Sequence, residues 1–454
     1  MALKTPISEV VQSVLSSLGK INNVSRYLLA FSGGIDSTVL LHVLAAHRHQ
    51  FSNVDLLAVH INHALNINSD QWAERCQTIC EQMKVGFVAI DVDATPRAGE
   101  SPEARARTVR YEAISRLVKP GDCLLTAHHQ DDQVETLLLQ LMRGSGPKGL
   151  AAMPEITTFK DALIARPLIH VRRDSIQSYA IKHQLKWVDD DSNRDVKYDR
   201  NFIRHEIIPR LQQRWPSLSQ TVSRSARYCA EASEILEATA RNAIEQMDLG
   251  DSEALSVSAL LKYSRAEQKN ILRYWFTLRR LSTPSSAQLD QVVDQILTAA
   301  VDATPRLTWE GSEVRRYRDR IYSLPQLKEV DVVEPIVWNM QQPLELDNLG
   351  ILKVAEGSGV GIARKYIGHK NLTVSFRQGG ESIQPAGRKE KHALKKLFQE
   401  AGVPPWVRER TPLIFVDGEL AAVAELFISQ KFQAQSGEDS YIFQWKSQYL
   451  GGSA

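Results

Sequence analysis

The sequence predicts an α/β protein: an N-terminal domain with a Rossmann-like, doubly wound parallel sheet, then an α-helical middle domain and a small mixed α+β C-terminal domain. Three observations support this fold class. Short apolar runs alternate with helical patterns as far as about residue 215, which is typical of a parallel sheet. Helical patterns then continue to about residue 325, and strand-like runs with one helix fill residues 346–454. We therefore expect domains over 1–215, 216–325 and 346–454, with a proline-containing linker over 326–345.

The first predicted elements are a helix over residues 1–20 and a buried strand over residues 27–31. The strand leads into a turn with two glycines and three hydroxyl or carboxylate side chains: Ser32, Gly33, Gly34, Ile35, Asp36 and Ser37. A helix is expected to begin at Thr38. Glycines let backbone N–H groups approach a ligand, and the N-terminus of a helix favours an anion. We interpret the turn as a phosphate cradle formed by its glycines and serines, with Ala30 and Ile35 also at this site.

The carboxylate of Asp36 is repulsive in a phosphate site unless a cation intervenes. Mg²⁺ that bridges this carboxylate and the phosphates is the simplest resolution. The pattern G-x-x-x-x-G-K-[ST] is absent from the sequence, which excludes a Walker-type nucleotide site. A purely structural strand–turn–helix corner is the alternative interpretation of this turn.

Polar side chains follow other predicted strands. Strands are expected over 55–61, 86–91 and 122–127, with helices over 69–84 and from residue 101 between them. Asn62 and His63 follow the first of these strands, and His128 and His129 follow the last. Because ligands bind beyond the carboxyl ends of parallel strands, we expect these side chains and the glycine turn to form one site.

The two histidines lead into a predicted helix that carries three acids: Asp131, Asp132 and Glu135. On a helix, Glu135 shares a face with both aspartates. This arrangement suits a metal site, a capped helix with solvated charges, or a substrate and catalytic site beside ATP, which we favour. Two acids on one face suit an ammonium-bearing substrate, and His128 would contact the α-phosphate or the reacting oxygen. The expected buried face of this helix consists of Val134, Leu137, Leu138 and Leu141.

Two basic segments complete the N-terminal domain. Residues 142–153 contain three glycines and a proline, and we interpret them as a lid that carries Arg143 and Lys148, with a plain surface connection as the alternative. A strand is expected over 162–165 and a helix over 172–186. The arginine-rich segment 198–209, which contains Arg200 and Arg204, then closes the domain.

These motifs, taken in this order, resemble the tRNA(Ile)-lysidine synthase family of PP-loop ATP pyrophosphatases. The resemblance rests on the glycine turn, on His128-His129-x-Asp131-Asp132-x-x-Glu135-Thr136, on Arg143-Gly144-Ser145-Gly146 and on Arg200-Asn201-x-Ile203-Arg204. The run Glu103-x-x-Ala106-Arg107-x-x-Arg110-Tyr111 also agrees with the family pattern. The glycine turn alone would fit several PP-loop enzymes, whereas the ordered set is more specific and covers essentially the full chain.

The resemblance implies an enzyme that joins lysine to the wobble cytidine of the isoleucine tRNA with a CAU anticodon. ATP would adenylate the C2 carbonyl oxygen of cytosine, releasing pyrophosphate, and the lysine ε-amine would then displace AMP. The tRNA would change from methionine to isoleucine identity.

The resemblance also implies roles for particular residues. Catalytic roles fall to Asp36 with Mg²⁺, to His128 and Arg204, and to Asp132 and Glu135, which would bind the lysine amino groups and accept a proton. ATP contacts fall to Asn62, His63, Arg107 and Arg110, and substrate contacts to Arg143, Lys148 and Arg200.

The composition is that of an ordinary globular protein, with 43% apolar residues, 24% charged residues and a formal net charge of +2. This nearly neutral charge gives no bulk argument for nucleic acid, so an RNA-binding surface must be local. The four cysteines lack metal-ligand spacing, and the chain shows neither a signal-peptide core nor a run of transmembrane length. We therefore expect a cytoplasmic protein without membrane association and without an obligate protein partner.

The later domains offer local basic surfaces. Residues 265–280 interleave basic residues with Tyr274, Trp275 and Phe276, and we expect the aromatic side chains in the core and the basic face on tRNA. Residues 313–322 have the pattern of a basic strand that could bind tRNA as well. Residues 387–398 form a basic turn and helix, interpreted as a phosphate-binding face or, alternatively, a solvated one: Arg388, Lys389, Lys391, His392, Lys395 and Lys396. In the related enzymes this last domain helps to recognise the acceptor end of the tRNA.

Two rival functions remain open. One is another PP-loop enzyme, but a cysteine-dependent tRNA thiolase needs paired cysteines near the site, and Cys76 and Cys80 have helical spacing. A glutamine-dependent amidotransferase commonly uses a cysteine at the mature N-terminus, where this chain has Ala2. The other rival is a non-catalytic tRNA-binding protein, against which the intact Asp36 and the acid pair argue.

Overall fold

The computed structural model describes residues 8–51, 54–63, 69–96, 102–188, 195–247, 254–330, 334–368 and 372–448. The chain divides into two units, Met1–Ile235 and Leu236–Ala454. The expected helix start at residue 101 lies outside the described residues.

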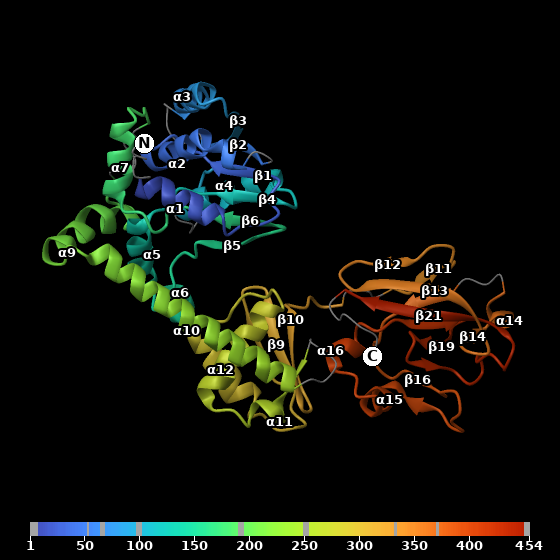
Figure 1. Ribbon diagram of the computed structural model, residues 1–454. Helices are drawn as coiled ribbons and strands as arrows, with labels where there is room; N and C mark the ends of the chain where they lie inside the picture. The colour runs from blue at the N-terminus through green and yellow to red at the C-terminus, as the bar shows by residue number, and fades with distance from the viewer. Residues whose placement is uncertain are drawn as a thin grey trace. The chain divides into compact units, whose positions relative to one another are not determined.

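A six-stranded sheet organises the first unit, with the strand order β3-β2-β1-β4-β6-β5 (Figure 1). Its strands are β1 Arg26–Ala30, β2 Asp55–Asn62, β3 Gly86–Asp91, β4 Asp122–Leu125, β5 Ile156–Phe159 and β6 Ala162–Ala165. Neighbouring strands are parallel except β5, an edge strand that the sequence did not predict and that pairs antiparallel with β6. The predicted doubly wound fold is confirmed, and its topological switch point lies between β1 and β4.

Helices on both faces of this sheet, together with the helices that follow it, make up the rest of the first unit, and the last of them continues into the second unit. They are α1 Glu9–Leu18, α2 Ile35–Ala46, the 3₁₀ turn Arg48–Phe51, α3 Ser69–Gln82, α4 Pro102–Leu117, α5 Gln130–Met142, α6 Pro147–Leu150, α7 Arg173–Lys182, α8 Asp199–Phe202, a π-helical turn Ile203–Ile207, α9 Ile208–Arg214 and α10 Leu218–Gln246. Successive strand residues point to opposite faces. Accordingly, Leu29 of β1 belongs to the core cluster of α1, α2, α3 and α7, whereas its neighbour Leu28 packs in the cluster that contains Ile114 of α4.

Three details of the first unit correct the sequence expectations. Helix α2 begins at Ile35 rather than Thr38 because Gly34 is its N-cap, so Asp36 lies in the first helical turn. On α5, Val134 is buried as expected, but Leu141 is 49% exposed, and acids occupy buried positions instead. The expected lid segment is not a plain loop, since it contains α6.

The beginning of the second unit combines helices with an antiparallel sheet of order β7-β10-β9-β8. Its elements are β7 Ala254–Ser256, α11 Val257–Leu260, α12 Arg265–Leu278, α13 Ser286–Gln291, a π-helical turn Val292–Ile296, β8 Arg306–Trp309, β9 Ser312–Tyr317 and β10 Arg320–Pro325. The expected single strand over 313–322 is therefore a hairpin. Trp275 and Phe276 are fully buried, which confirms the core assignment of these two aromatic side chains.

Two larger sheets and a two-stranded ribbon form the end of the chain, in the orders β11-β15-β18-β19-β20, β12-β13-β21-β14 and β16-β17. The elements are β11 Ile336–Trp338, β12 Leu344–Leu346, β13 Gly350–Ser358, β14 Ile362–Ala363, α14 Arg364–Ile367, β15 Leu372–Ser375, β16 Ser382–Ile383, β17 His392–Ala393, α15 Leu394–Glu400, α16 Pro405–Arg408, β18 Leu413–Val416, β19 Glu419–Val423, β20 Phe427–Ile428 and β21 Asp439–Ser447.

The segment 326–345 is not a simple linker, because β11 and β12 within it pair with β15 and β13. The expectation of one helix was also too low, since α14, α15 and α16 are all present among the described residues. Between β18 and β19, Asp417 and Gly418 have φ of 50° and 79°, as a hairpin turn with two left-handed residues requires.

Candidate active site

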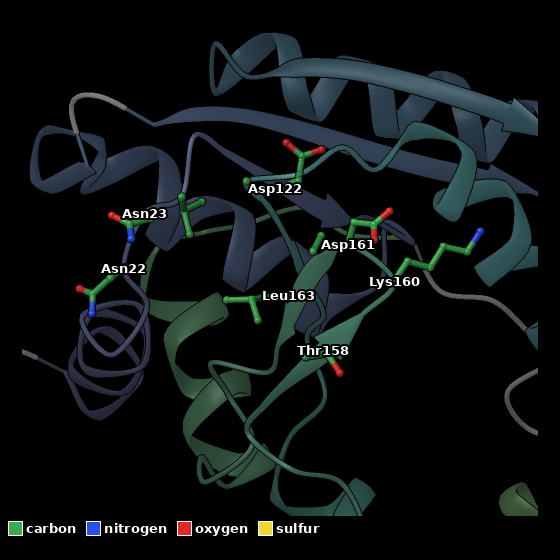
Figure 2. A pocket seen from close by; sticks show the side chains of 10 residues that line it. Asn22, Asn23, Asp122, Thr158, Lys160, Asp161 and Leu163 are labelled. Carbon is green, nitrogen blue, oxygen red and sulfur yellow. The ribbon is translucent and has the colours of Figure 1, made fainter. Parts of the chain in front are cut away.

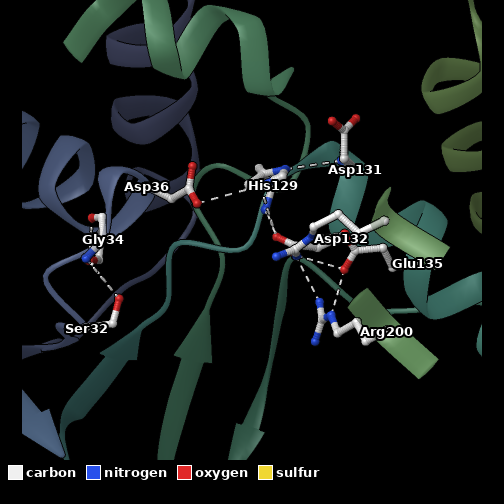
Figure 3. A network of polar contacts seen from close by, with 10 residues as sticks. Ser32, Gly34, Asp36, His129, Asp131, Asp132, Glu135 and Arg200 are labelled. Carbon is white, nitrogen blue, oxygen red and sulfur yellow. Dashed lines mark hydrogen bonds and ion pairs between the residues drawn. The ribbon is translucent and has the colours of Figure 1, made fainter. Parts of the chain in front are cut away.

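The glycine turn between β1 and α2 is held in place by contacts with Cys76 and Val188. Gly33 has a φ of +81°, and a Cβ there would lie 2.6 Å from the Sγ of Cys76. Its carbonyl accepts the N–H of Val188 at 2.8 Å. Gly34 caps α2 without a side-chain hydrogen bond, so the first N–H groups of the helix face the turn. The turn therefore has the form that an anion needs, with Ser32 beside Gly34 (Figure 3) and the hydroxyls of Ser32 and Ser37 3.1 Å apart.

Asp36 projects from the first turn of α2 toward His129 (Figure 3). Its Oδ2 lies 3.8 Å from Nε2 of His129, and its Oδ1 is buried without a hydrogen-bond partner among the described residues. Burial raises the pKa of Asp36, and Asp132 raises it further, whereas His129 lowers it. A carboxylate oxygen with a free lone pair beside a phosphate cradle fits Mg²⁺, which takes one or two carboxylates together with phosphate oxygens.

The described residues do not form a metal site from protein side chains alone. The described residues contain no group of three or more His, Cys, Asp or Glu side chains able to hold a metal ion. The residues therefore fit a cation that is shared with a nucleotide.

His129 connects Asp36 to the acids of α5. It is the N-cap of this helix: its Nδ1 accepts the N–H of Asp131 at 3.2 Å, and its own N–H donates to Oδ2 of Asp132 at 2.8 Å. Because Nδ1 accepts a hydrogen bond, the ring proton of the neutral imidazole lies on Nε2, which faces the carboxylates of Asp36 and Asp132. The sequence did not predict this capping role of His129.

Asp132 and Glu135 are buried against two arginines of the segment that follows the first sheet. Glu135 is 1% exposed, and its carboxylate accepts hydrogen bonds from Nε of Arg200 at 2.6 Å and from Nε of Arg204 at 2.5 Å. Asp132 Oδ1 accepts Nη2 of both arginines, at 2.9 and 3.1 Å (Figure 3). We call these four residues the acid–arginine cluster. The expected acid pair is thus present, but its charges are already balanced by two guanidiniums.

The cluster also determines the protonation of its members. Burial would raise the pKa of Asp132, but its interactions with His129, Arg200 and the other nearby groups outweigh burial and hold this pKa well below its usual range. Burial alone would lower the pKa of Arg204, yet its hydrogen bonds to Glu135 raise it. Both groups are therefore charged at neutral pH.

His128 lies between the acid–arginine cluster and the next strand. Its Nδ1 is 2.8 Å from the hydroxyl of Thr126. Burial lowers its pKa to about 3, with Arg200, Arg166 and Arg107 contributing, although Asp132 opposes the shift. The ring is therefore neutral at pH 7, and its Nε2 can serve as a hydrogen-bonding group for a substrate.

The residues predicted to contact ATP lie at the end of β2 and on α4. The amide of Asn62 donates to Asp70 at 3.0 Å and to Asp91 at 2.9 Å, so it also supports the strand end. Nη2 of Arg110 lies 3.3 Å from Nε2 of His63. Burial, with the charge of Arg110, lowers the pKa of His63 to about 4. On the same helix, Arg107 stacks 5.2 Å over the ring of Tyr111.

Other predicted residues lie apart from this cluster or belong to the second unit. Arg143 follows α5 and Lys148 lies on α6, and both are exposed. In the second unit, Arg388, Lys389, Lys391 and Lys395 are exposed, and only Lys395 lies on α15. Arg388 pairs with Glu400 at 2.8 Å.

The basic strand expected over 313–322 is corrected for two of its arginines. Arg316 is 5% exposed and donates to the carbonyls of Ile296 and Leu297, while Arg315 pairs with Glu313. Hydrogen bonds within the fold use both guanidiniums.

A hollow of about 360 Å³ lies at the opposite edge of the first sheet (Figure 2). It is lined by the segments that enter β1, β4 and β6, including Asn22, Asp122 and Ala162. Ligands of such sheets bind at the carboxyl edge, so this hollow is not the candidate site.

Three family models match the chain: the PP-loop domain over residues 5–211, the TilS substrate binding domain over residues 255–322 and the TilS substrate C-terminal domain over residues 372–445. The sheet, the glycine turn and the first of these matches define a PP-loop protein of the ATP pyrophosphatase type.

Relatives named tRNA(Ile)-lysidine synthase align along nearly the whole chain. The one from Coxiella burnetii is 40% identical over 428 residues, 94% of each chain. The one from Photobacterium profundum is 41% identical, covering 93% of this chain and 96% of the relative, and the one from Methylococcus capsulatus is 38% identical with the same coverage. The chain belongs to the tRNA(Ile)-lysidine synthase family, which confirms the resemblance seen in the sequence. None of the helices in the described ranges has the length and apolar character that a membrane crossing requires.

Proposed function

We propose that this protein uses ATP to join lysine to C2 of the wobble cytidine of tRNA(Ile) with a CAU anticodon, and that the residues at the β1–β4 switch point carry out both steps. The observation that supports this most directly is Asp36, beside the glycine turn, whose buried Oδ1 has no hydrogen-bond partner in the part of the chain that the structure describes. A cation there would join the protein to a triphosphate lying across the N-terminus of α2.

In the first step, the C2 carbonyl oxygen of cytosine attacks the α-phosphorus of ATP. The bond to the β-phosphate breaks, and pyrophosphate leaves with its electron pair. The backbone N–H groups of the turn and the hydroxyls of Ser32 and Ser37 hold the departing pyrophosphate. Asp36 would hold Mg²⁺, which neutralises charge on the phosphates. His128 is neutral and donates its Nε2 proton as a hydrogen bond to the α-phosphate, where negative charge develops.

In the second step, the lysine ε-amine attacks C2, the C2–O bond breaks, and AMP leaves. The amine has a pKa of about 10.4 in water and must lose a proton before it attacks. We assign Asp132 and Glu135 to binding the ammonium form. A carboxylate whose pKa lies below its usual range is a weak base, so the idea that Asp132 accepts the proton loses support, and the proton instead passes to a phosphate oxygen of the bound AMP group and leaves with it.

Lysine binding requires a rearrangement of the acid–arginine cluster. The carboxylates of Asp132 and Glu135 are balanced by Arg200 and Arg204, and Glu135 is 1% exposed. We propose that Arg200, which lies on the short helix α8, turns aside so that the ammonium takes its place. Arg204, in the adjoining π-helical turn, stays on Glu135 and helps to stabilise the adenylation step.

The remaining assignments are proposals of the same kind. Asn62, His63, Arg107 and Arg110 surround the nucleoside part of ATP, with Ala30 and Ile35 at the strand and helix ends. Arg143 and Lys148 close over the site as a lid. The exposed Lys389, Lys391 and Lys395, with Arg388, contact tRNA phosphates. We retain domain boundaries near residues 215 and 325. Because tRNA is the proposed substrate, we place the reaction in the cytoplasm.

The decisive experiment is incubation of the protein with ATP, labelled lysine and purified tRNA. Label should appear on the CAU-anticodon isoleucine tRNA and not on the methionine tRNA with the same anticodon. Without tRNA, ATP–pyrophosphate exchange should be absent. Exchange that never appears, even with tRNA, would favour a non-catalytic tRNA-binding protein. Normal pyrophosphate release by Asp36→Ala would make the assignment of Asp36 wrong.

A thiolase function is less well supported. Cys76 and Cys80 are buried, and burial raises the pKa of each thiol to about 12. Thiols of this kind are poor nucleophiles, because the thiolate is the reactive form.

A further inference from the structure

Arg166 is a buried arginine at the active-site edge that no step above uses. It directly follows β6, and the preceding residue, Ala165, accepts the N–H of Thr126 at 3.0 Å, so Arg166 lies beside the β4 end that carries His128. Only 6% of Arg166 is exposed. The position was predictable from the rule that located His128, since both follow strands of the parallel sheet.

The guanidinium of Arg166 is only partly satisfied. Its Nη1 donates to the carbonyl of Pro154 at 2.8 Å, and its side chain also bonds Tyr111. Its Nε is buried and has no hydrogen-bond partner in the part of the chain that the structure describes. Burial and the charge of Arg107 lower the pKa of Arg166, while Tyr111 opposes the shift. Arg166 therefore has a second cation nearby, and no described carboxylate forms an ion pair with it.

Two other buried arginines, Arg316 and Arg408, differ from Arg166 in this respect. Arg316 and Arg408, 5% and 6% exposed, each donate their Nε to a backbone carbonyl, at 3.0 and 2.7 Å. Their guanidiniums support the fold. In Arg166 the Nε–H of the guanidinium is instead left for a ligand. A buried charge without a counterion destabilises a protein, and binding of an anion would remove this cost. The guanidinium fork matches phosphate geometry.

We infer that Arg166 binds a phosphodiester of the tRNA next to the nucleotide that reacts. This inference rests on the proposed function and names one contact of the polynucleotide with the active site. The triphosphate of ATP is assigned to the turn after β1, and β6 lies two strands away from β1, about 10 Å at the usual strand spacing. Between them lies the β4 end, which carries His128, the residue assigned to the reacting α-phosphate. A phosphate beside Arg166 is therefore on the acceptor side of the reaction.

A phosphate scan on the RNA tests this with the unaltered full-length protein. The probe is a synthetic stem-loop RNA with a CAU anticodon, in which each linkage of the anticodon is replaced in turn by an uncharged methylphosphonate. A methylphosphonate at one of the linkages next to the wobble cytidine should weaken binding about tenfold, as expected for the loss of a charge-assisted hydrogen bond. If no linkage next to the wobble cytidine alters the dissociation constant, the inference is wrong.

Variants then connect the sensitive linkage to Arg166. Arg166→Met should bind the normal RNA about tenfold more weakly, should lose the extra effect of the methylphosphonate, and should show a salt dependence lowered by about 0.7 in log–log slope, the value for one contact to a single strand. Arg166→Lys keeps the charge and should keep the slope, with a smaller methylphosphonate effect than in the unaltered protein. Arg316→Met is the matched control, because it removes another buried arginine and should leave RNA binding unchanged.

Each outcome decides between sources of the phosphate. Weaker ATP binding by Arg166→Met with unchanged RNA binding would assign the site to the nucleotide and overturn the inference. Should Arg166→Met not fold, an identical methylphosphonate effect in Arg166→Lys and in the unaltered protein would overturn it equally. Transfer of labelled lysine by the unaltered protein is a separate readout: its failure would refute the proposed function while the RNA-binding measurements still stand.

Discussion

Replacing Asp36 by asparagine should stabilise the first unit while it abolishes catalysis. The substitution keeps the size of the side chain and removes its charge. An unpaired buried polar atom costs about 1–3 kcal/mol, and more when its group is charged. Oδ1 of Asp36 has no hydrogen-bond partner among the described residues, and the amide variant removes the charge but not the polar atom. The N-terminus of α2 offsets about 0.3–1 kcal/mol of this cost. The free energy of unfolding should therefore rise by about 1 kcal/mol, which corresponds to about 2–4 °C in Tm for a unit of this size.

Thermal unfolding followed by circular dichroism, first in EDTA and then with Mg²⁺ and ATP, measures both effects. Without ligand, Asp36→Asn should melt above the unaltered protein. With Mg²⁺ and ATP, the order should reverse, since only the carboxylate can hold the cation. Because burial raises the pKa of Asp36, its charge costs stability above that pKa, and the difference in EDTA should shrink as the pH falls through it. Pyrophosphate release should fall at least about 100-fold.

Asp131→Asn serves as the matched control. Asp131 also lies in the first turn of a helix, but its Oδ1 accepts the hydroxyl of Ser219 at 2.8 Å. Its amide variant should gain no stability. A lower Tm for Asp36→Asn in EDTA, or an equal gain in the control, would refute the reasoning.

Three further predictions follow from the ion pairs. Glu135→Gln leaves two guanidiniums around one aspartate and should lower the free energy of unfolding by about 3 kcal/mol in urea titration; a loss under about 1 kcal/mol would contradict this. Because the folded-state pKa of Asp132 is depressed, its stabilisation is present at neutral pH and is lost as the pH falls below its ordinary pKa and then through the folded value. Asp132→Asn should therefore flatten the acid limb of the stability curve, and unchanged limbs would count against it. The double variant Lys389→Gln, Lys391→Gln should lower the log–log salt slope of tRNA binding by up to about 1.8, whereas Arg388→Gln, whose side chain already forms an ion pair, should change it less.

The sequence alone was sufficient to predict the elements that depend on a local rule. The strand 27–31 and the turn between β1 and α2 were predictable because buried parallel strands are continuous apolar runs and glycine marks the turn. The rule that ligands bind beyond strand ends then located the polar side chains of the site. Edge strand β5 was missed because its four residues, Ile156–Phe159, have no apolar run of their own and pair only with β6.

The state of the acids could not be predicted from spacing. Helical periodicity correctly put Asp132 and Glu135 on one face, but it could not say that Arg200 and Arg204, 65 to 72 residues later in the chain, reach them. Such a pairing depends on how the π-helical turn after α8 packs on α5. Leu141 was expected in the core from the same helical period, yet it is 49% exposed.

The unbalanced charges of the site indicate on which side of the reacting base each phosphate group would bind. Asp132 and Glu135 cancel Arg200 and Arg204, so this cluster has no net charge before lysine enters. Asp36, in the first turn of α2 after β1, and Arg166, directly after β6, each have a buried polar atom without a hydrogen-bond partner within the described ranges. One is an anion that needs a cation, and the other is a cation that needs an anion. The β4 end with its neutral His128 lies between them, so a metal-bound triphosphate and an RNA phosphate would bind on opposite sides of the reacting base, as transfer of AMP to that base requires.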